Sequence, residues 1–137
     1  MMAIHFRVST AIITRCYPMD EATLIRVVGL FVDRMFDDLI IGFLFDGKDR
    51  DRIVGHEFEL ASKHVLGLGS YTGRPIGPLH RAMRINGGQF RRRLAILRTV
   101  LREEGVAEPI IDDWINHDRK LEAVLTDGTD CAPPESP

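Results

Sequence analysis

Apolar residues recur at helical spacing in four stretches of the chain, and the first lies between residues 18 and 39. Pro18 and Asp20 mark its start, because an aspartate can accept hydrogen bonds from the first free N–H groups of a helix. The apolar stripe that follows has the spacing of one helix face and consists of Leu24, Val27, Val28, Phe31, Met35 and Leu39. The acidic pair at 37–38 and the polar segment D-G-K-D-R-D at 46–51 predict the end of this helix and a loop.

Three further helices are predicted downstream. One runs from about Asp51 to Val65 and ends at the glycine-rich segment L-G-L-G-S-Y-T-G. The next follows the turn I-N-G-G and stops at Gly105. Its stripe consists of Phe90, Leu94, Leu97 and Leu101. The last runs from about Pro109 to Leu125, and no internal repeat is visible, so the elements predict an all-α protein.

The two ends of the chain differ from this pattern. Residues 1–17 alternate in part like a strand, at Ile4, Phe6 and Val8, and then read A-I-I-T-R, which could begin a helix. They are therefore treated as an N-terminal extension of unknown structure. Residues 126–137, T-D-G-T-D-C-A-P-P-E-S-P, have the composition of a flexible tail. A length of 137 residues fits one domain, which is expected over 18–125.

Composition excludes several classes of protein. The formal net charge is −2 and the pI is about 6.2, so no overall field favours nucleic acid or an anionic membrane surface. The longest apolar run, 39–45, is far shorter than the roughly 20 residues of a membrane span. Without a clean signal-peptide pattern, a cytoplasmic location is expected. Cys16 and Cys131 lie far apart, which favours two reduced thiols over a disulfide or a cysteine zinc site.

Two predicted helices carry charged residues on an apolar face. In the helix over 51–65, one face is fully apolar, while a second face carries Glu57 and His64, with His56 at its edge. The second face consists of Ile53, Glu57, Leu60 and His64. In the next helix, Arg93 falls inside the apolar stripe, where a charge is costly unless it is paired or reaches solvent. The alternative is an ordinary solvated face and basic surface whose side chains extend over apolar neighbours.

The segment Y-T-G-R-P-I-G-P-L-H at 71–80 ends in His80, just before the next helix. A histidine in such a glycine- and proline-bounded segment is a candidate metal ligand, although alone it reads more readily as a turn or surface residue. H-E-F-E-L is not the zinc motif H-E-x-x-H, because His64 follows His56 by two helical turns. Six phenylalanines are assigned to the core: Phe31, Phe36, Phe43, Phe45, Phe58 and Phe90.

Read in order, these features resemble the truncated haemoglobins, the short two-over-two globins, and most closely their group I. The resemblance rests on Y-T-G before His80, on Ile85 and Phe90 five and ten residues after it, and on E-E-G-V and I-I-D-D-W beyond. R-I-V-G-H-E-F-E-L at 52–60 is similar to that family's helix E, and V-V-G-L-F-V-D-R-M-F-D-D at 27–38 to its helix B. The resemblance covers roughly residues 22–125.

The resemblance implies a globin-like, truncated two-over-two helical sandwich with a haem domain over 18–125. It implies that His80 is the proximal ligand of the haem iron, and the absence of C-x-x-C-H makes the cofactor a non-covalent heme b. The proximal side and its neighbourhood are expected to contain Tyr71, Ile76, Leu79, Met83, Ile85, Phe90 and Leu94. The distal side is expected to contain Phe31, Phe45, Ile53 and Leu60, with His56, Glu57 and Arg93 as its polar residues.

Three residues depart from the family pattern. Phe31 stands where the family usually has a ligand-holding tyrosine, Glu57 where glutamine or leucine is more common, and Arg93 at a usually apolar place. A direct or water-linked ion pair between Glu57 and Arg93 would offset both burial costs, with Arg93 donating to bound gas. In the alternative, Arg93 reaches solvent or a haem propionate, and Glu57 is simply exposed. His56 matches a place from which some group I members supply a second iron ligand, or it contacts a propionate.

The implied function is reversible binding, and possible transport, of oxygen or another diatomic gas such as nitric oxide or carbon monoxide. An alternative is nitric oxide dioxygenation or peroxidase-like chemistry at the same iron, which would require a separate reductase. A third reading is a haem-free helical interaction protein that keeps the globin scaffold.

His80→Ala tests the proximal assignment. Because His80 occupies the ligand position in the resemblance, the variant is expected to lose most of its haem, or to hold it five-coordinate with a foreign ligand. Absorbance spectra and haem content of the purified proteins measure this. A variant with an unchanged spectrum and haem content would contradict the assignment.

Overall fold

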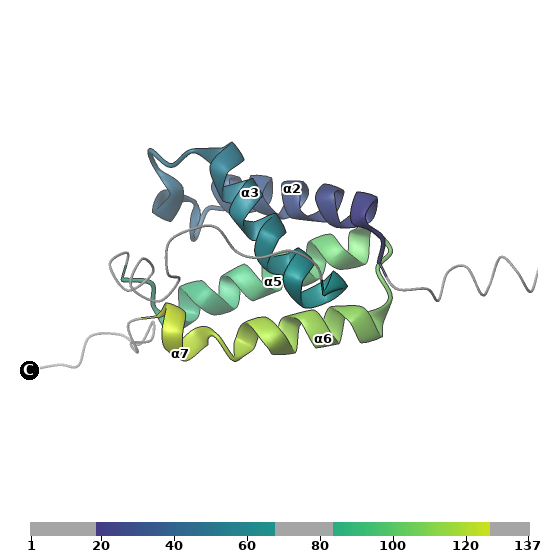
Figure 1. The fold of residues 1–137 in the computed structure, drawn as a ribbon. Coiled ribbons are helices and arrows are strands. Elements are labelled where there is room, and N and C mark those ends of the chain that lie inside the picture. The colour runs from purple at the N-terminus through teal and green to yellow at the C-terminus, as the bar shows by residue number, and fades with distance from the viewer. Residues whose placement is uncertain (1–18, 68–83, 127–137) are drawn as a thin grey trace, which may run out of the picture.

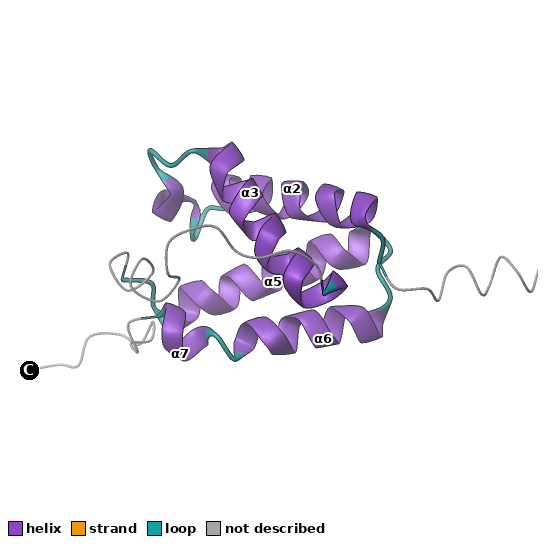
Figure 2. Ribbon diagram, viewed as in Figure 1, coloured by secondary structure: helices purple, strands orange, loops and turns teal. Residues whose placement is uncertain are grey.

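The computed structural model describes residues 19–67 and 84–126, and their regular secondary structure is helical (Figure 1, Figure 2). The N-terminal extension, the segment at 68–83 that contains His80, and residues 127–137 lie outside the described residues. In chain order the elements are α2 (Glu21–Asp37), η1 (Gly42–Phe45), α3 (Arg50–Ala61), η2 (Ser62–Leu66), α5 (Gly87–Glu103), α6 (Glu108–Arg119) and α7 (Glu122–Leu125). The predicted all-α class is confirmed.

The starts of α2 and α5 are set by capping side chains. Asp20 accepts a hydrogen bond from the N–H of Thr23 at 2.8 Å, as the sequence predicts. Asn86 accepts from the N–H of Gln89 at 2.8 Å, and the Gln89 side chain accepts from the Asn86 N–H at 3.0 Å. This reciprocal capping box satisfies two N–H groups that the helix itself leaves free. At the far end of α5, Gly105 takes a positive φ of 74° and ends the helix where predicted.

The helix predicted over 51–65 continues as two kinds of helix. It is α-helical from Arg50 to Ala61, and then widens into the π-helical segment η2 over Ser62–Leu66. A π turn adds a residue per turn and rotates the side chains that follow it relative to a regular helix. His64 therefore does not keep the position that regular α-helical spacing gives it beside Glu57.

The single helix predicted from Pro109 to Leu125 is wrong in one respect, because it breaks near Lys120. The N–H of Leu121 bonds the carbonyl of Asp118 at 2.9 Å, three residues back instead of four. This tighter turn separates α6 from α7 and brings Leu125 into the core, where it is 6% exposed. Thr126, assigned to the flexible tail, is also buried, and its N–H donates to the Glu122 carbonyl.

The turn after α2 corrects two further expectations. α2 ends at Asp37, so Leu39 lies beyond its apolar stripe and is fully exposed; Phe43, assigned to the core, is 58% exposed. Asp38 holds the turn by accepting from Arg92 at 2.7 Å and from the N–H of Ile41 at 3.1 Å. The hydrogen bond from Arg92 is the main reason that the pKa of Asp38 is lowered.

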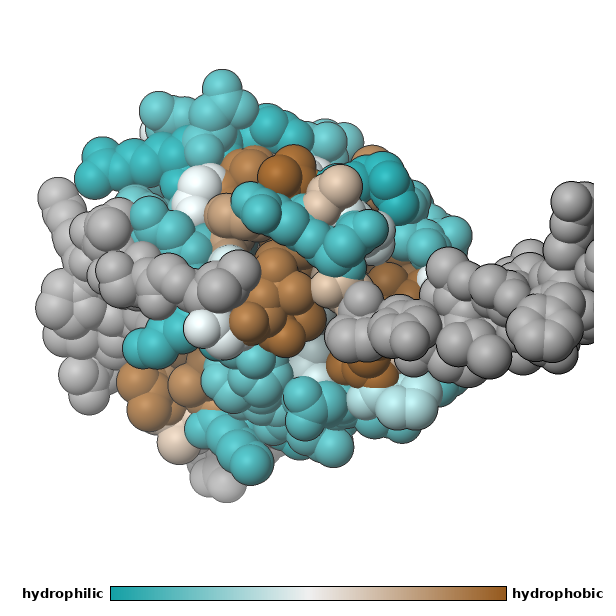
Figure 3. Space-filling model, turned by 45° about the vertical axis from the view of Figure 1, so that its right-hand side comes forward, coloured by the Kyte–Doolittle hydropathy of each residue, from teal (hydrophilic) through white to brown (hydrophobic). Residues whose placement is uncertain are grey.

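The helices form two layers around one core. α2 and α3 make one layer, and α5 and α6 make the other (Figure 1). α2 contacts both α3 and α5, and α5 contacts α6, so the apolar stripes of the long helices meet between the layers. In Figure 3, apolar atoms gather near the middle of one face with hydrophilic atoms around them. None of the helices described at 19–67 and 84–126 is long and apolar enough to cross a membrane.

Gly42→Ala tests the close approach of η1 to α2. A Cβ built on Gly42 would lie 2.7 Å from the carbonyl oxygen of Phe36, so the turn must shift to accept it. We expect the free energy of unfolding to fall by about 1–3 kcal/mol, measured by urea unfolding.

Gly55→Ala is the matched control, because nothing lies within 4 Å of its built Cβ. In that helical position alanine should instead stabilise by about 0.5–1 kcal/mol. Equal effects at both glycines would contradict the prediction.

Candidate functional site

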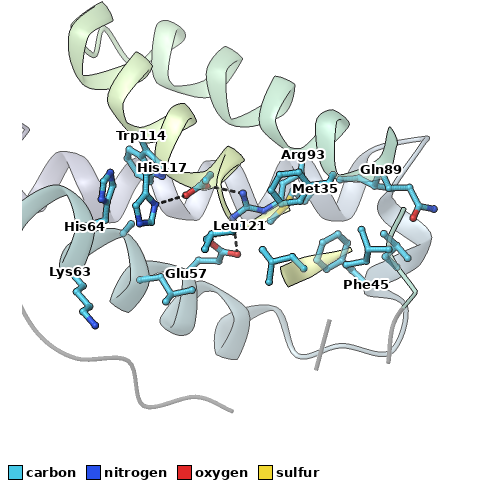
Figure 4. A pocket seen from close by; sticks show the side chains of 18 residues that line it. Met35, Phe45, Glu57, Lys63, His64, Gln89, Arg93, Trp114, His117 and Leu121 are labelled. Carbon is cyan, nitrogen blue, oxygen red and sulfur yellow. Dashed lines mark hydrogen bonds and ion pairs between the residues drawn. The ribbon is translucent and has the colours of Figure 1, made fainter. Parts of the chain in front are cut away.

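A cavity of about 500 Å³ lies between the two layers (Figure 4). The apolar part of its wall consists of Met35, Ile41, Leu44, Phe45, Leu60, Ala61, Ile85, Phe90, Trp114, Leu121 and Leu125. The polar part consists of Glu57, Lys63, His64, Gln89, Arg93, His117 and Asp118. Lys63 and His64 lie at one end, while Phe45 and Gln89 lie at the other. The volume is within the roughly 300–1,000 Å³ of pockets for small molecules and cofactors.

The predicted site residues fall into three groups. Those that line the cavity are Phe45, Glu57, Leu60, Ile85, Phe90 and Arg93. Those that are described but do not belong to its wall are Phe31, Ile53, His56 and Leu94. Those that lie outside the described residues are Tyr71, Ile76, Leu79, His80 and Met83. Phe31 and Leu94 are buried in the core, because α2 and α5 turn these positions toward each other.

Arg93 is the central polar group of the cavity wall, and it is paired as the sequence predicts. Its Nη2 lies 3.1 Å from Oε2 and 3.3 Å from Oε1 of Glu57, which approaches from α3. Its Nη1 donates to Oδ2 of Asp118 on α6 at 2.9 Å. About a fifth of each of the Arg93 and Glu57 side chains is exposed, so neither the solvent-extended arginine nor the freely exposed glutamate of the alternative is found. The guanidinium thus joins three helices.

The surroundings of Arg93 keep it charged. Burial opposes the charged form, but the charges and hydrogen bonds of Glu57 and Asp118 outweigh burial and raise the pKa of Arg93 above its ordinary value. The guanidinium carbon also lies 5.1 Å from the ring centre of Phe31, a cation–π distance. Phe31 therefore contacts the polar centre although it does not line the cavity.

Two histidines close one end of the cavity. The rings of His64 and His117 stack with centroids 3.6 Å apart, and His117 Nδ1 lies 3.2 Å from Oδ1 of Asp118 (Figure 4). His64 Nε2 is buried without a hydrogen-bond partner; Oδ2 of Asp113 is 3.6 Å away, too far for one. Burial, followed by the neighbouring His117, lowers the pKa of His64. The His64 ring thus lines the end of the cavity while its Nε2 stays buried beside Asp113.

Asp118 and His117 are the main site residues that the sequence analysis does not find. A signal for Asp118 exists, because it follows Ile111 by seven residues and Trp114 by four, the spacing of one helix face. A carboxylate at a buried helical position needs a cationic partner, and Arg93 is a cation predicted inside an apolar stripe. His117 gives no such signal, since its place beside His64 depends on the π turn.

The described residues do not form a metal site by themselves. No cluster of three or more histidine, cysteine, aspartate or glutamate side chains within 19–67 and 84–126 is arranged to hold an ion. What they form is a partly open, largely apolar space whose wall carries the Arg93 guanidinium with its two carboxylates, and Lys63 at one end. Such a space suits a mostly apolar molecule with few polar groups.

Solved structures identify the fold. Two layers of paired helices around a cavity define an all-α, globin-like class. A truncated haemoglobin from Tetrahymena pyriformis in its Fe(III) form matches with a TM-score of 0.71 and 18% identity, over 75% of this chain and 88% of that chain. A glutamine-to-glutamate variant of that protein matches with a TM-score of 0.71 and 19% identity, over the same shares of the two chains. A tyrosine-to-phenylalanine variant matches with a TM-score of 0.71 and 18% identity. No protein-family profile and no curated protein matches the sequence. The fold is thus that of a truncated haemoglobin.

The lowered pKa of His64 predicts a loss of stability in acid. The unfolded chain takes up this proton near the ordinary pKa of 6.5, whereas the native state is protonated only at lower pH. The unfolded state therefore binds more protons, and the free energy of unfolding falls as the pH drops through the ordinary pKa of 6.5. His64→Gln should show a smaller slope in urea unfolding across this range. Identical slopes in both proteins would contradict the prediction.

Proposed function

We propose that this chain is a haem-binding, group I-like truncated haemoglobin that reversibly binds a diatomic gas. The observation that carries the proposal is the largely apolar cavity between the helix layers of a truncated-haemoglobin fold, with Arg93 on its wall. Solved structures of that fold are described as truncated haemoglobins in an Fe(III) form, which implies bound iron in those proteins. Heme b is the proposed cofactor here, held without covalent attachment.

The residues present fit such a group. Phe45, Leu60, Ile85 and Phe90 supply apolar surface from both layers, which a flat porphyrin requires. When bound, haem supplies an iron that coordinates a diatomic gas. His80 is the proposed iron ligand, by its position in the resemblance.

The polar environment proposed for the gas is provided by Arg93. The family's usual tyrosine is replaced by Phe31, which lacks a donor, and Arg93 lies against the ring of Phe31. A guanidinium has five N–H donors, so the carboxylates of Glu57 and Asp118 leave hydrogens free to donate elsewhere. A permanently charged donor stabilises the partial negative charge of bound oxygen.

Two measurements distinguish simple gas binding from its alternatives. A Soret band in the purified protein would distinguish a haem protein from a haem-free helical interaction protein with the same scaffold. Turnover of nitric oxide or peroxide with an added reductant would distinguish an enzyme, served by a separate reductase, from a gas carrier. Absence of a Soret band after expression with haem supplied would overturn the proposal.

Arg93→Leu tests the role of the guanidinium in the gas-bound protein. Loss of a charged hydrogen bond is expected to speed oxygen release about tenfold or more, measured by stopped-flow absorbance. Glu57→Gln should act in the same sense but less strongly, because it weakens one of the two contacts that fix Arg93 while Asp118 still holds Nη1. Arg91→Leu, on the exposed face of the same helix, is the matched control and should leave the rate unchanged. An oxygen release rate that does not change in Arg93→Leu would contradict this role of the guanidinium and would leave only apolar contacts to the gas.

A further inference from the structure

Asp118 uses both oxygens of its carboxylate at the cavity wall. Oδ2 accepts from Arg93 Nη1 at 2.9 Å, and Oδ1 lies 3.2 Å from His117 Nδ1. Its side chain is 11% exposed, half the exposed fraction of Glu57. Asp118 is thus the more deeply buried of the two carboxylates that hold the guanidinium.

Charge neutrality does not explain this carboxylate. Glu57 alone balances the single positive charge of Arg93, and it does so through both of its oxygens. A second buried carboxylate adds one negative charge to the wall, and such a charge is costly unless it is fully hydrogen-bonded. Two hydrogen-bond partners offset the free-energy cost of burying Asp118. Its carboxylate provides a second, independent contact to Arg93.

The two carboxylates contact different terminal nitrogens of the guanidinium. Glu57, on α3, engages Nη2, whereas Asp118, on α6, engages Nη1. With Glu57 alone, the long arginine side chain keeps freedom to rotate about its terminal bonds. A second contact at the other nitrogen, together with the Phe31 ring 5.1 Å from the guanidinium carbon, removes that freedom. The direction of the remaining N–H donors is then determined by three helices.

We propose that Asp118 is a positioning residue, which fixes the Arg93 guanidinium so that its remaining donors face a ligand bound in the cavity. His117 supports this role by holding the other oxygen of Asp118. The identity of the ligand as a gas on haem rests on the proposed function, whereas the fixed orientation of Arg93 does not.

The orientation is measured directly by NMR of the arginine side chain in the protein as purified. In the unmodified protein, hindered rotation of the guanidinium should give separate signals for the Arg93 terminal N–H protons. Asp118→Asn should merge them, whereas Asp118→Glu, which keeps the charge, should retain at least part of the separation. Asp112→Asn, the same change on an exposed position of α6, is the control and should leave the signals unchanged. Separate signals that persist in Asp118→Asn would overturn the proposal.

The functional consequence is measured by oxygen release. Asp118→Asn is expected to speed release about tenfold, because a freely rotating Arg93 donates to the ligand for a smaller fraction of the time. Asp118→Glu should recover part of this change. If Asp118→Asn does not fold, His117→Gln answers the same question, since it keeps the carboxylate but loosens its Oδ1. His117→Gln should change the Arg93 signals and the oxygen release rate in the same direction as Asp118→Asn, but by less. If neither changes, the proposal is overturned.

The two levels of the proposal fail in different ways. Merged Arg93 signals in Asp118→Asn without any Soret band in the parent protein would leave the positioning role intact and overturn the proposed gas binding. A normal Soret band in the parent protein, with Arg93 signals and oxygen release rates unchanged in Asp118→Asn, would leave gas binding intact and overturn the positioning role.

Discussion

The burial of one guanidinium between two helix layers is the constraint on which the site depends. Arg93 lies on α5 within an apolar face, and α3 and α6 each supply a carboxylate to it. Removing either partner would leave a buried charge less well compensated, which is costly in a medium of low polarity. The relative placement of three helices is therefore coupled to one polar cluster, and the cavity wall is built around that cluster.

The same cluster distinguishes this cavity wall from the one that the resemblance implies. By that resemblance Phe31 stands where a tyrosine is usual, and Phe31 donates no hydrogen bond and packs in the core against the guanidinium. The polar group on the wall comes from α5 and carries a full charge. Two carboxylates contact it, because an uncompensated charge is costly in this place.

Most of the fold is predictable from the sequence, since apolar periodicity and capping residues are local signals. Asp20, the turn before α5 and Gly105 each define a helix end within a few residues. The pairing of Glu57 with Arg93 is also predictable, because two isolated charges on apolar faces need compensation. The break near Lys120 and the π turn of η2 are not, since neither contains proline or glycine to mark it. The stacking of His64 on His117 depends on the π turn and escapes prediction with it.

The charges of the cavity wall are unevenly distributed along it, and this has an electrostatic consequence. The guanidinium of Arg93 faces the carboxylates of Glu57 and Asp118, whereas Lys63 adds a separate positive charge at the end of the wall where His64 lies. The potential beside the carboxylates is therefore more negative than the potential at the Lys63 end. A molecule with one positive and one negative end is favoured in one of its two orientations along such a cavity.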